Sequence, residues 1–138
     1  MLTVDPHLPY EIEIDIDDSD IDFLGHVNNT VYLRWVQDAA TVHWRVIASK
    51  EEQHSLLWVV VKHEIEYKRP AFKDDRIVAR TWTGKANRLH FERFTEIKRL
   101  SDRKLLAAAR TLWCPVDSQT LKPVRVSGDI KAMFSSDK

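Results

Sequence analysis

Five aspartates lie between residues 15 and 22, and carboxylates in such a cluster can bind a cation, attack a carbonyl or accept a proton from water. They are Asp15, Asp17, Asp18, Asp20 and Asp22. A calcium-binding loop that begins at Asp18 would need glycine at its sixth position and glutamate at its twelfth. Phe23 and Asn29 occupy these positions, so the sequence excludes that loop. We therefore expect most of these aspartates to be solvated.

Asp22 differs from the others because it opens the segment Asp22-Phe-Leu-Gly-His26-Val-Asn-Asn29, which leads into a predicted helix. A helix N-terminus presents free N–H groups and a positive partial charge, which can polarise a carbonyl group. A carboxylate beside it can act as a nucleophile or as a general base. His26 either bonds the loop backbone or orders Asp22 and water. For Asn29, a helix cap is favoured over a contact with substrate.

The other histidines and the cysteine do not form a recognisable catalytic or metal site. His43 and His63 fall on apolar faces, where histidines are usually core or interface residues. No two histidines have the spacing of a metal site, so we expect no metal. Cys114 precedes a proline at a strand end and lacks an evident activating partner, which favours a packing role.

Length and composition limit the function further. The 138 residues suit one domain over 1–138, and the formal net charge of zero gives no global attraction to nucleic acid or an anionic membrane. The three glycines cannot supply a Walker A loop or a GxGxxG fingerprint. The chain has no secretory signal pattern, and its longest apolar run, at 56–61, is too short to span a membrane. With a single cysteine, we expect a cytoplasmic protein.

Hydrophobic periodicity predicts the elements that must position Asp22. An alternating pattern indicates a strand over 10–16, and a 3.6-residue period indicates a long helix over 30–49 that starts at or beside Asn29. Further strands are expected over 57–68, 76–83, 90–100 and 105–114, with a turn at 84–87, while 128–135 fits either type. The second strand should place Val59, Val61, His63, Ile65 and Tyr67 on one face. The order of these elements, a strand, a long helix and then four strands, predicts an α+β domain with one helix on an antiparallel sheet.

The pattern Asp-x-x-Gly-His-Val-Asn-Asn-x-x-Tyr, which begins at Asp22, resembles the hot-dog-fold acyl-CoA thioesterases of the 4-hydroxybenzoyl-CoA thioesterase-like group. The resemblance covers nearly the whole chain. It continues in order through Trp58-Val-Val-Val61, Glu64-Ile-Glu-Tyr67-Lys-Arg-Pro70-Ala71, Asp74-Asp75, Arg110-Thr-Leu-Trp113 and Val116-Asp117.

The resemblance implies a curved antiparallel sheet wrapped around one long central helix, and a homodimer or homotetramer with sites at subunit interfaces. It makes Asp22 the catalytic carboxylate of an acyl-CoA thioesterase, acting as nucleophile or general base. Some branches use a histidine where this chain has Asn29. The residues expected to bind substrate or order the site are His26, Asn29, Tyr32, Trp58 and Val59.

Coenzyme A would be part of the substrate, and no separate cofactor is expected. Its phosphates need cations, for which Lys85, Arg88 and Arg93 around Gly84 are candidates, although an ordinary solvated turn is favoured over this role. Two alternatives remain open. The domain could bind acyl groups without catalysis, or it could hydrolyse thioesters of acyl carrier protein.

Overall fold

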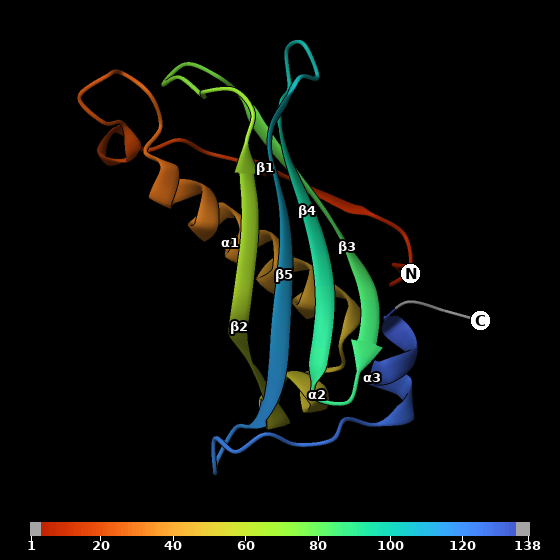
Figure 1. Cartoon of the computed structure of the whole chain (residues 1–138). Helices are drawn as coiled ribbons and strands as arrows, with labels where there is room; N and C mark the ends of the chain where they lie inside the picture. The colour runs from red at the N-terminus through yellow and green to blue at the C-terminus, as the bar shows by residue number, and fades with distance from the viewer. Residues whose placement is uncertain (1–3, 135–138) are drawn as a thin grey trace.

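The computed structural model describes residues 4–134, in which a five-stranded antiparallel sheet has a long helix lying across one face (Figure 1). The strand order is β1-β3-β4-β5-β2, so β1 and β2 are the edges. The strands are β1 Tyr10–Ile14, β2 Leu56–Tyr67, β3 Ile77–Asn87, β4 His90–Arg99 and β5 Leu105–Asp117, and the helices are α1 Asn29–Ile47, α2 Lys50–Ser55 and α3 Gly128–Met133. The α+β hot-dog architecture expected from the sequence is confirmed.

Helix α1 begins one residue earlier and ends two residues earlier than predicted. Its N-cap is Asn28, whose side chain accepts a hydrogen bond from the N–H of Thr30, so the prediction that Asn29 is the cap was wrong. The helix ends at Ile47 because Ser49 caps the next helix, α2, in a capping box with Glu52. The sequence analysis missed α2, whose six residues are too few for a periodic signal.

The core lies between α1 and the sheet. Tyr32, Trp35 and Ala39 of α1 pack against small and aliphatic side chains of the strands, among them Ala79 and Ala107. The alanine-rich start of β5 forms a strand, as predicted, and its small side chains leave room for the bulky aromatic residues of the helix.

A bulge divides β2 into two halves, and the alternation of inward and outward side chains is reversed from one half to the other. The register against β5 shifts between Val60 and Lys62, which leaves Val61 as the extra residue. Val59 and Val61 are therefore exposed, whereas His63 and Ile65 are partly buried. The prediction that these four residues share one face was wrong, because simple alternation fails where one residue is inserted into a strand.

The connection between β3 and β4 also differs from the prediction. Gly84 lies within β3, and the turn falls at 88–89, where Arg88 has a φ of 52°. A side chain at Gly84 would collide with the carboxylate of Glu92 and the ring of Phe94 on the neighbouring strand. The glycine therefore permits a close approach between strands rather than a turn.

The segment whose type the sequence left open forms α3 over Gly128–Met133. Position 135, the last residue of that predicted segment, lies outside the described residues.

Candidate active site

The loop from Ile21 to Val27 holds Asp22 in a tight turn. The N–H of Asp22 donates to the carbonyl of His26 at 2.7 Å, and the N–H of Gly25 donates to the carbonyl of Asp22 at 3.0 Å. Gly25 has a φ of +80°, a conformation that side chains rarely adopt. The glycine of the sequence pattern is therefore needed to close this turn.

The carboxylate of Asp22 is fixed by its own loop. Its Oδ1 accepts hydrogen bonds from the N–H of Leu24 at 2.9 Å and of His26 at 3.1 Å. None of the hydrogen bonds within residues 4–134 involves Oδ2. One oxygen thus positions the group, and the other remains available to a ligand or water.

His26 orders Asp22 through its backbone. The imidazole packs edge-on against Phe72, with ring centroids 5.1 Å apart, while the backbone N–H donates to Asp22. A backbone bridge between His26 and Phe72 anchors this side of the loop to the connection that follows β2. Among the described contacts, the ring acts as a packing group.

Asp20 anchors the other side of the loop. It is only 2% exposed, and its carboxylate accepts hydrogen bonds from Arg34 on α1 at 2.9 Å and from the N–H of Asp17 at 3.0 Å. The hydrogen bond from Arg34 is the main reason that the pKa of Asp20 lies below its ordinary value, against the opposing effect of burial. The expectation that most of the aspartates are solvated does not hold for Asp20.

Asp22 opens onto a depression of about 410 Å³ at the N-terminus of α1. His26, Asn29 and Tyr32 line the same depression, so the structure brings these four predicted site residues together. Tyr32 is 1% exposed, and its hydroxyl accepts a hydrogen bond from the N–H of Ala71 at 3.0 Å. Burial raises the pKa of Tyr32, which keeps the phenol neutral.

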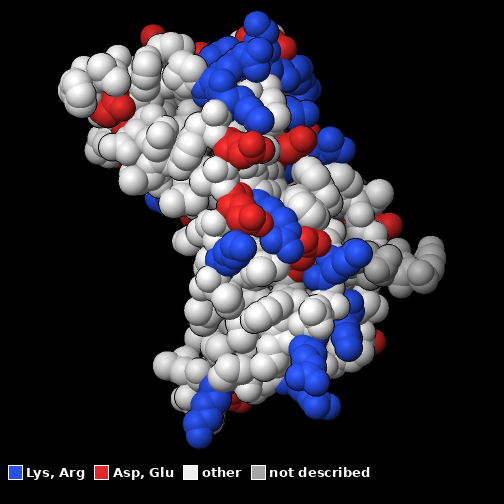
Figure 2. All heavy atoms as spheres, viewed as in Figure 1, with Lys and Arg blue, Asp and Glu red and all other residues white. Residues whose placement is uncertain are grey.

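Residues at the end of β2 complete this depression, and the sequence analysis gave them no role. The hydroxyl of Tyr67 donates to the carbonyl of Asn29 at 3.0 Å, which ties β2 to the start of α1. Lys68 and Arg69 line the depression beside it. Lys68 lies 3.6 Å from Glu66, whereas Arg69 forms no ion pair within residues 4–134. Figure 2 shows lysines and arginines gathered at the end of the molecule that carries the β2–β3 and β4–β5 connections.

Trp58 and Val59 line a different cavity, of about 700 Å³, between α1 and the start of β2. This cavity and the Asp22 depression lie toward opposite ends of β2, a strand of 12 residues. A fully extended strand of this length measures roughly 40 Å. Within one chain, Trp58 and Val59 are therefore separate from Asp22.

The cations proposed near Gly84 occupy two different environments. Lys85 and Arg88 are exposed on the β3–β4 hairpin and line neither of the two cavities. Arg93 is 4% exposed and points inward, so its assignment to a surface turn was wrong. It faces the interior because it alternates with the outward side chains of β4.

No helix within residues 4–134 is long and apolar enough to cross a membrane. The same residues contain no group of three or more histidine, cysteine, aspartate or glutamate side chains placed to hold a metal ion.

Residues 16–134 match the model of the thioesterase-like superfamily. The chain belongs to this superfamily. It is thus a thioester hydrolase by family, as the sequence patterns indicated. No curated protein sequence matches the chain.

Solved structures share the fold at low sequence identity. A 1,4-dihydroxy-2-naphthoyl-CoA thioesterase from Synechocystis is 18% identical, with 91% of this chain and 95% of that chain covered and a TM-score of 0.77. A Thermus thermophilus thioesterase complexed with coenzyme A and zinc is 22% identical, with 90% of both chains covered and a TM-score of 0.77. A Pseudomonas aeruginosa PAO1 protein is 18% identical, with 99% of both chains covered and a TM-score of 0.80.

Proposed function

We propose that this protein hydrolyses acyl-CoA thioesters with Asp22 as its catalytic carboxylate. The observation that carries the proposal is the Asp22 carboxylate, which is held by two backbone N–H groups through Oδ1 and opens onto a depression at a helix N-terminus. Oδ2 either attacks the thioester carbonyl or takes a proton from an attacking water. In both routes water supplies the hydroxyl of the free acid, and coenzyme A leaves as the thiol.

The start of α1 is suited to polarising the thioester carbonyl. The side chain of Asn28 accepts a hydrogen bond from the N–H of Thr30. The N–H of Asn29 takes part in none of the hydrogen bonds of the described residues. This free N–H and the positive end of the helix dipole would stabilise the oxyanion that forms during attack.

Coenzyme A would bring its phosphates to cations around the depression. Lys68 and Arg69 line it directly, and Arg69 has no acidic partner within residues 4–134. Lys85 and Arg88 are on the β3–β4 hairpin, so they would reach the same coenzyme A only from a second subunit. We therefore favour Arg69 as the first phosphate ligand.

A dimer would bring the two cavities together. Leu57, Val59 and Val61 are 45%, 49% and 51% exposed on the edge strand β2, and an apolar edge of this kind favours pairing with another strand. Antiparallel pairing of β2 with the β2 of a second copy would place the start of one strand beside the end of the other. The aromatic cavity of one subunit would then adjoin the Asp22 depression of its partner and receive the acyl group.

Replacement of Asp22 by asparagine tests this function. Asparagine preserves size and the two accepted hydrogen bonds but cannot attack a carbonyl or accept a proton from water. We expect kcat for acyl-CoA hydrolysis to fall about a thousandfold or more at a nearly unchanged KM. Asp18→Asn, at an exposed aspartate that pairs with Lys73, is the matched control and should retain activity. Wild-type turnover in folded Asp22→Asn would reject the assignment and favour a non-catalytic acyl-binding module.

A further inference from the structure

Arg93 places a positive charge inside the aromatic cavity without an anion to balance it. Its Nη1 donates to Nδ1 of His43 at 2.8 Å and to Oγ1 of Thr81 at 3.2 Å. No carboxylate within residues 4–134 pairs with this guanidinium, and its Nε and Nη2 form none of the hydrogen bonds of these residues. An isolated buried charge is costly, so a protein that retains one gains from a partner that neutralises it.

His43, the neighbour of Arg93, is neutral and leaves the charge of the guanidinium unbalanced. The ring is fully buried, and Tyr10 stacks on it with ring centroids 5.1 Å apart. Burial, with a smaller contribution from Arg93, lowers the pKa of His43 to about 4. Burial also lowers the pKa of Arg93 to about 10, which still leaves the guanidinium charged at neutral pH. The pair therefore carries one net positive charge.

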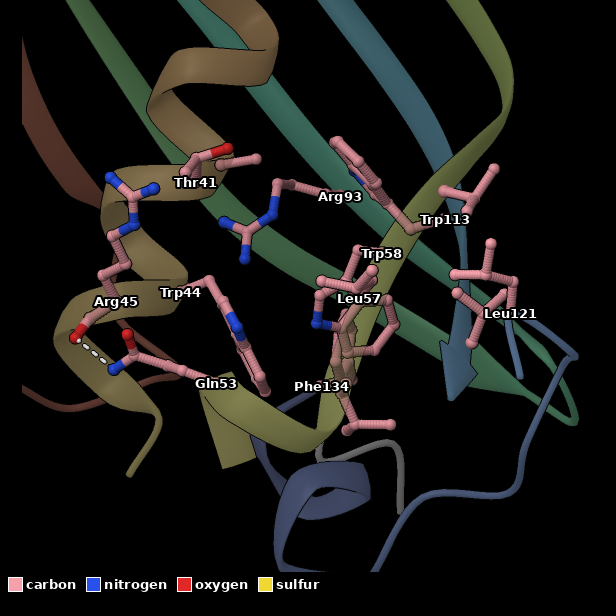
Figure 3. A pocket seen from close by; sticks show the side chains of 14 residues that line it. Thr41, Trp44, Arg45, Gln53, Leu57, Trp58, Arg93, Trp113, Leu121 and Phe134 are labelled. Carbon is pink, nitrogen blue, oxygen red and sulfur yellow. Dashed lines mark hydrogen bonds between the residues drawn. The ribbon is translucent and has the colours of Figure 1, made fainter. Parts of the chain in front are cut away.

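The described residues that line the cavity include no acid. No aspartate or glutamate lines the cavity, and Arg45 contributes a second cation from an exposed position on α1. The indole Nε1 atoms of Trp58 and Trp113, which both line it, are buried without a hydrogen-bond partner. Figure 3 shows Arg93 extending from β4 into the space between α1 and Trp58. Trp44 and Phe134 also line the cavity.

We propose that this cavity binds a molecule with an apolar or aromatic body that ends in a carboxylate, and that the carboxylate pairs with Arg93. The two free nitrogens of the guanidinium, Nε and Nη2, form the edge that binds a carboxylate through two parallel hydrogen bonds. The indole rings would enclose the apolar body. If the cavity is the acyl pocket, which rests on the proposed function, the carboxylate lies at the end of the acyl group remote from the thioester.

Tryptophan fluorescence can measure whether the cavity prefers a carboxylate to an uncharged ligand, because Trp44, Trp58 and Trp113 line it. We expect wild-type protein to bind decanoate at least about tenfold more tightly than 1-decanol. This ratio corresponds to the free energy of one charge-assisted hydrogen bond. In Arg93→Met, which keeps the length of the side chain without its charge, the two affinities should agree within about twofold. Equal binding of both probes by the wild type, or a decanoate preference that survives in Arg93→Met, would overturn the proposal.

Arg93→Lys keeps a charge in the cavity and serves as a second variant where Arg93→Met does not fold, as judged by circular dichroism. Lysine is a point charge without the two-pronged edge, so the decanoate preference should shrink but persist. An unchanged decanoate preference in Arg93→Lys would show that charge alone determines binding and would overturn the two-pronged pairing. A preference that increases in Arg93→Lys contradicts the pairing geometry.

Hydrolysis distinguishes the two sources of such a carboxylate, a free acid or the end of an acyl group. The paired substrates are decanoyl-CoA and its analogue with a terminal carboxyl group. If the acyl group carries the carboxylate, Arg93→Met should lower kcat/KM about tenfold for the carboxylated substrate only. Equal losses on both substrates would overturn the acyl-end assignment and leave the free acid as the ligand. Absence of hydrolysis with an intact decanoate preference would reject the proposed function but retain the binding site.

Discussion

Asp20 and Asp22 are two residues apart, but their carboxylates lie in opposite environments. Asp20 is 2% exposed and is neutralised by Arg34, which locks the loop to α1. Asp22 is partly exposed and receives only backbone hydrogen bonds, on one oxygen. Because Asp20 is buried and paired, its role is structural. The free oxygen of Asp22 can instead take part in a reaction. The same acidic segment thus supplies both the anchor and the reactive group.

His43 should make the stability of the protein depend on pH. Its pKa is lowered from 6.5 to about 4 in the folded protein, so the unfolded chain binds the proton more readily. Stability is therefore full above pH 6.5 and is lost as the pH falls toward 4. The linked loss amounts to at most about 3 kcal/mol. Urea unfolding at several pH values should show a flatter profile for His43→Asn, whose amide oxygen can still accept from Arg93.

The matched control for this measurement is His54→Gln, at an exposed position on α2. It should leave the pH profile of the unfolding free energy unchanged. If His43→Asn showed the wild-type slope between pH 6.5 and 4, another group would have to bind the proton.

At the scale of elements, Asn28 rather than Asn29 should determine the stability of α1. The side chain of Asn28 accepts hydrogen bonds from both the N–H and the hydroxyl of Thr30. Loss of such a cap in Asn28→Ala should lower the free energy of unfolding by about 1 kcal/mol. Asn29→Ala, one residue along, should change it by less than about 0.5 kcal/mol. Denaturant titration of the two variants checks this, and equal losses would contradict the cap assignment.

The elements that could be predicted are those in which one simple period continues without interruption. The strand at 90–99 and the long helix follow their patterns, and the Asp22 loop was located because its residue types form a recognisable motif. The bulge at Val61 is invisible to alternation, since an inserted residue leaves no compositional trace. The roles of Arg69 and Arg93 depend on which residues neighbouring strands place beside them. Sequence spacing does not contain that information.

At the scale of the whole molecule, the exposed edge of β2 predicts a dimer. Light scattering at micromolar concentration should give twice the chain mass of 16.2 kDa. Val59→Lys puts a charge on the 49% exposed edge position and should shift the protein toward monomer. Leu8→Lys, at a 59% exposed leucine ahead of the opposite edge strand β1, should leave the mass unchanged. A monomeric wild-type protein would remove the proposed meeting of the two cavities.

Strand order also has a consequence for the nascent chain. β3, β4 and β5 follow one another as hairpin neighbours, whereas β2 pairs only with β5, the last strand to leave the ribosome. At about 5–20 residues per second, translation leaves β2 without its partner for on the order of seconds. During that interval both edges of β2 expose backbone groups beside apolar side chains, a form that favours aggregation. Synthesis of this protein should therefore be most vulnerable to crowding and most dependent on chaperones between the emergence of β2 and that of β5.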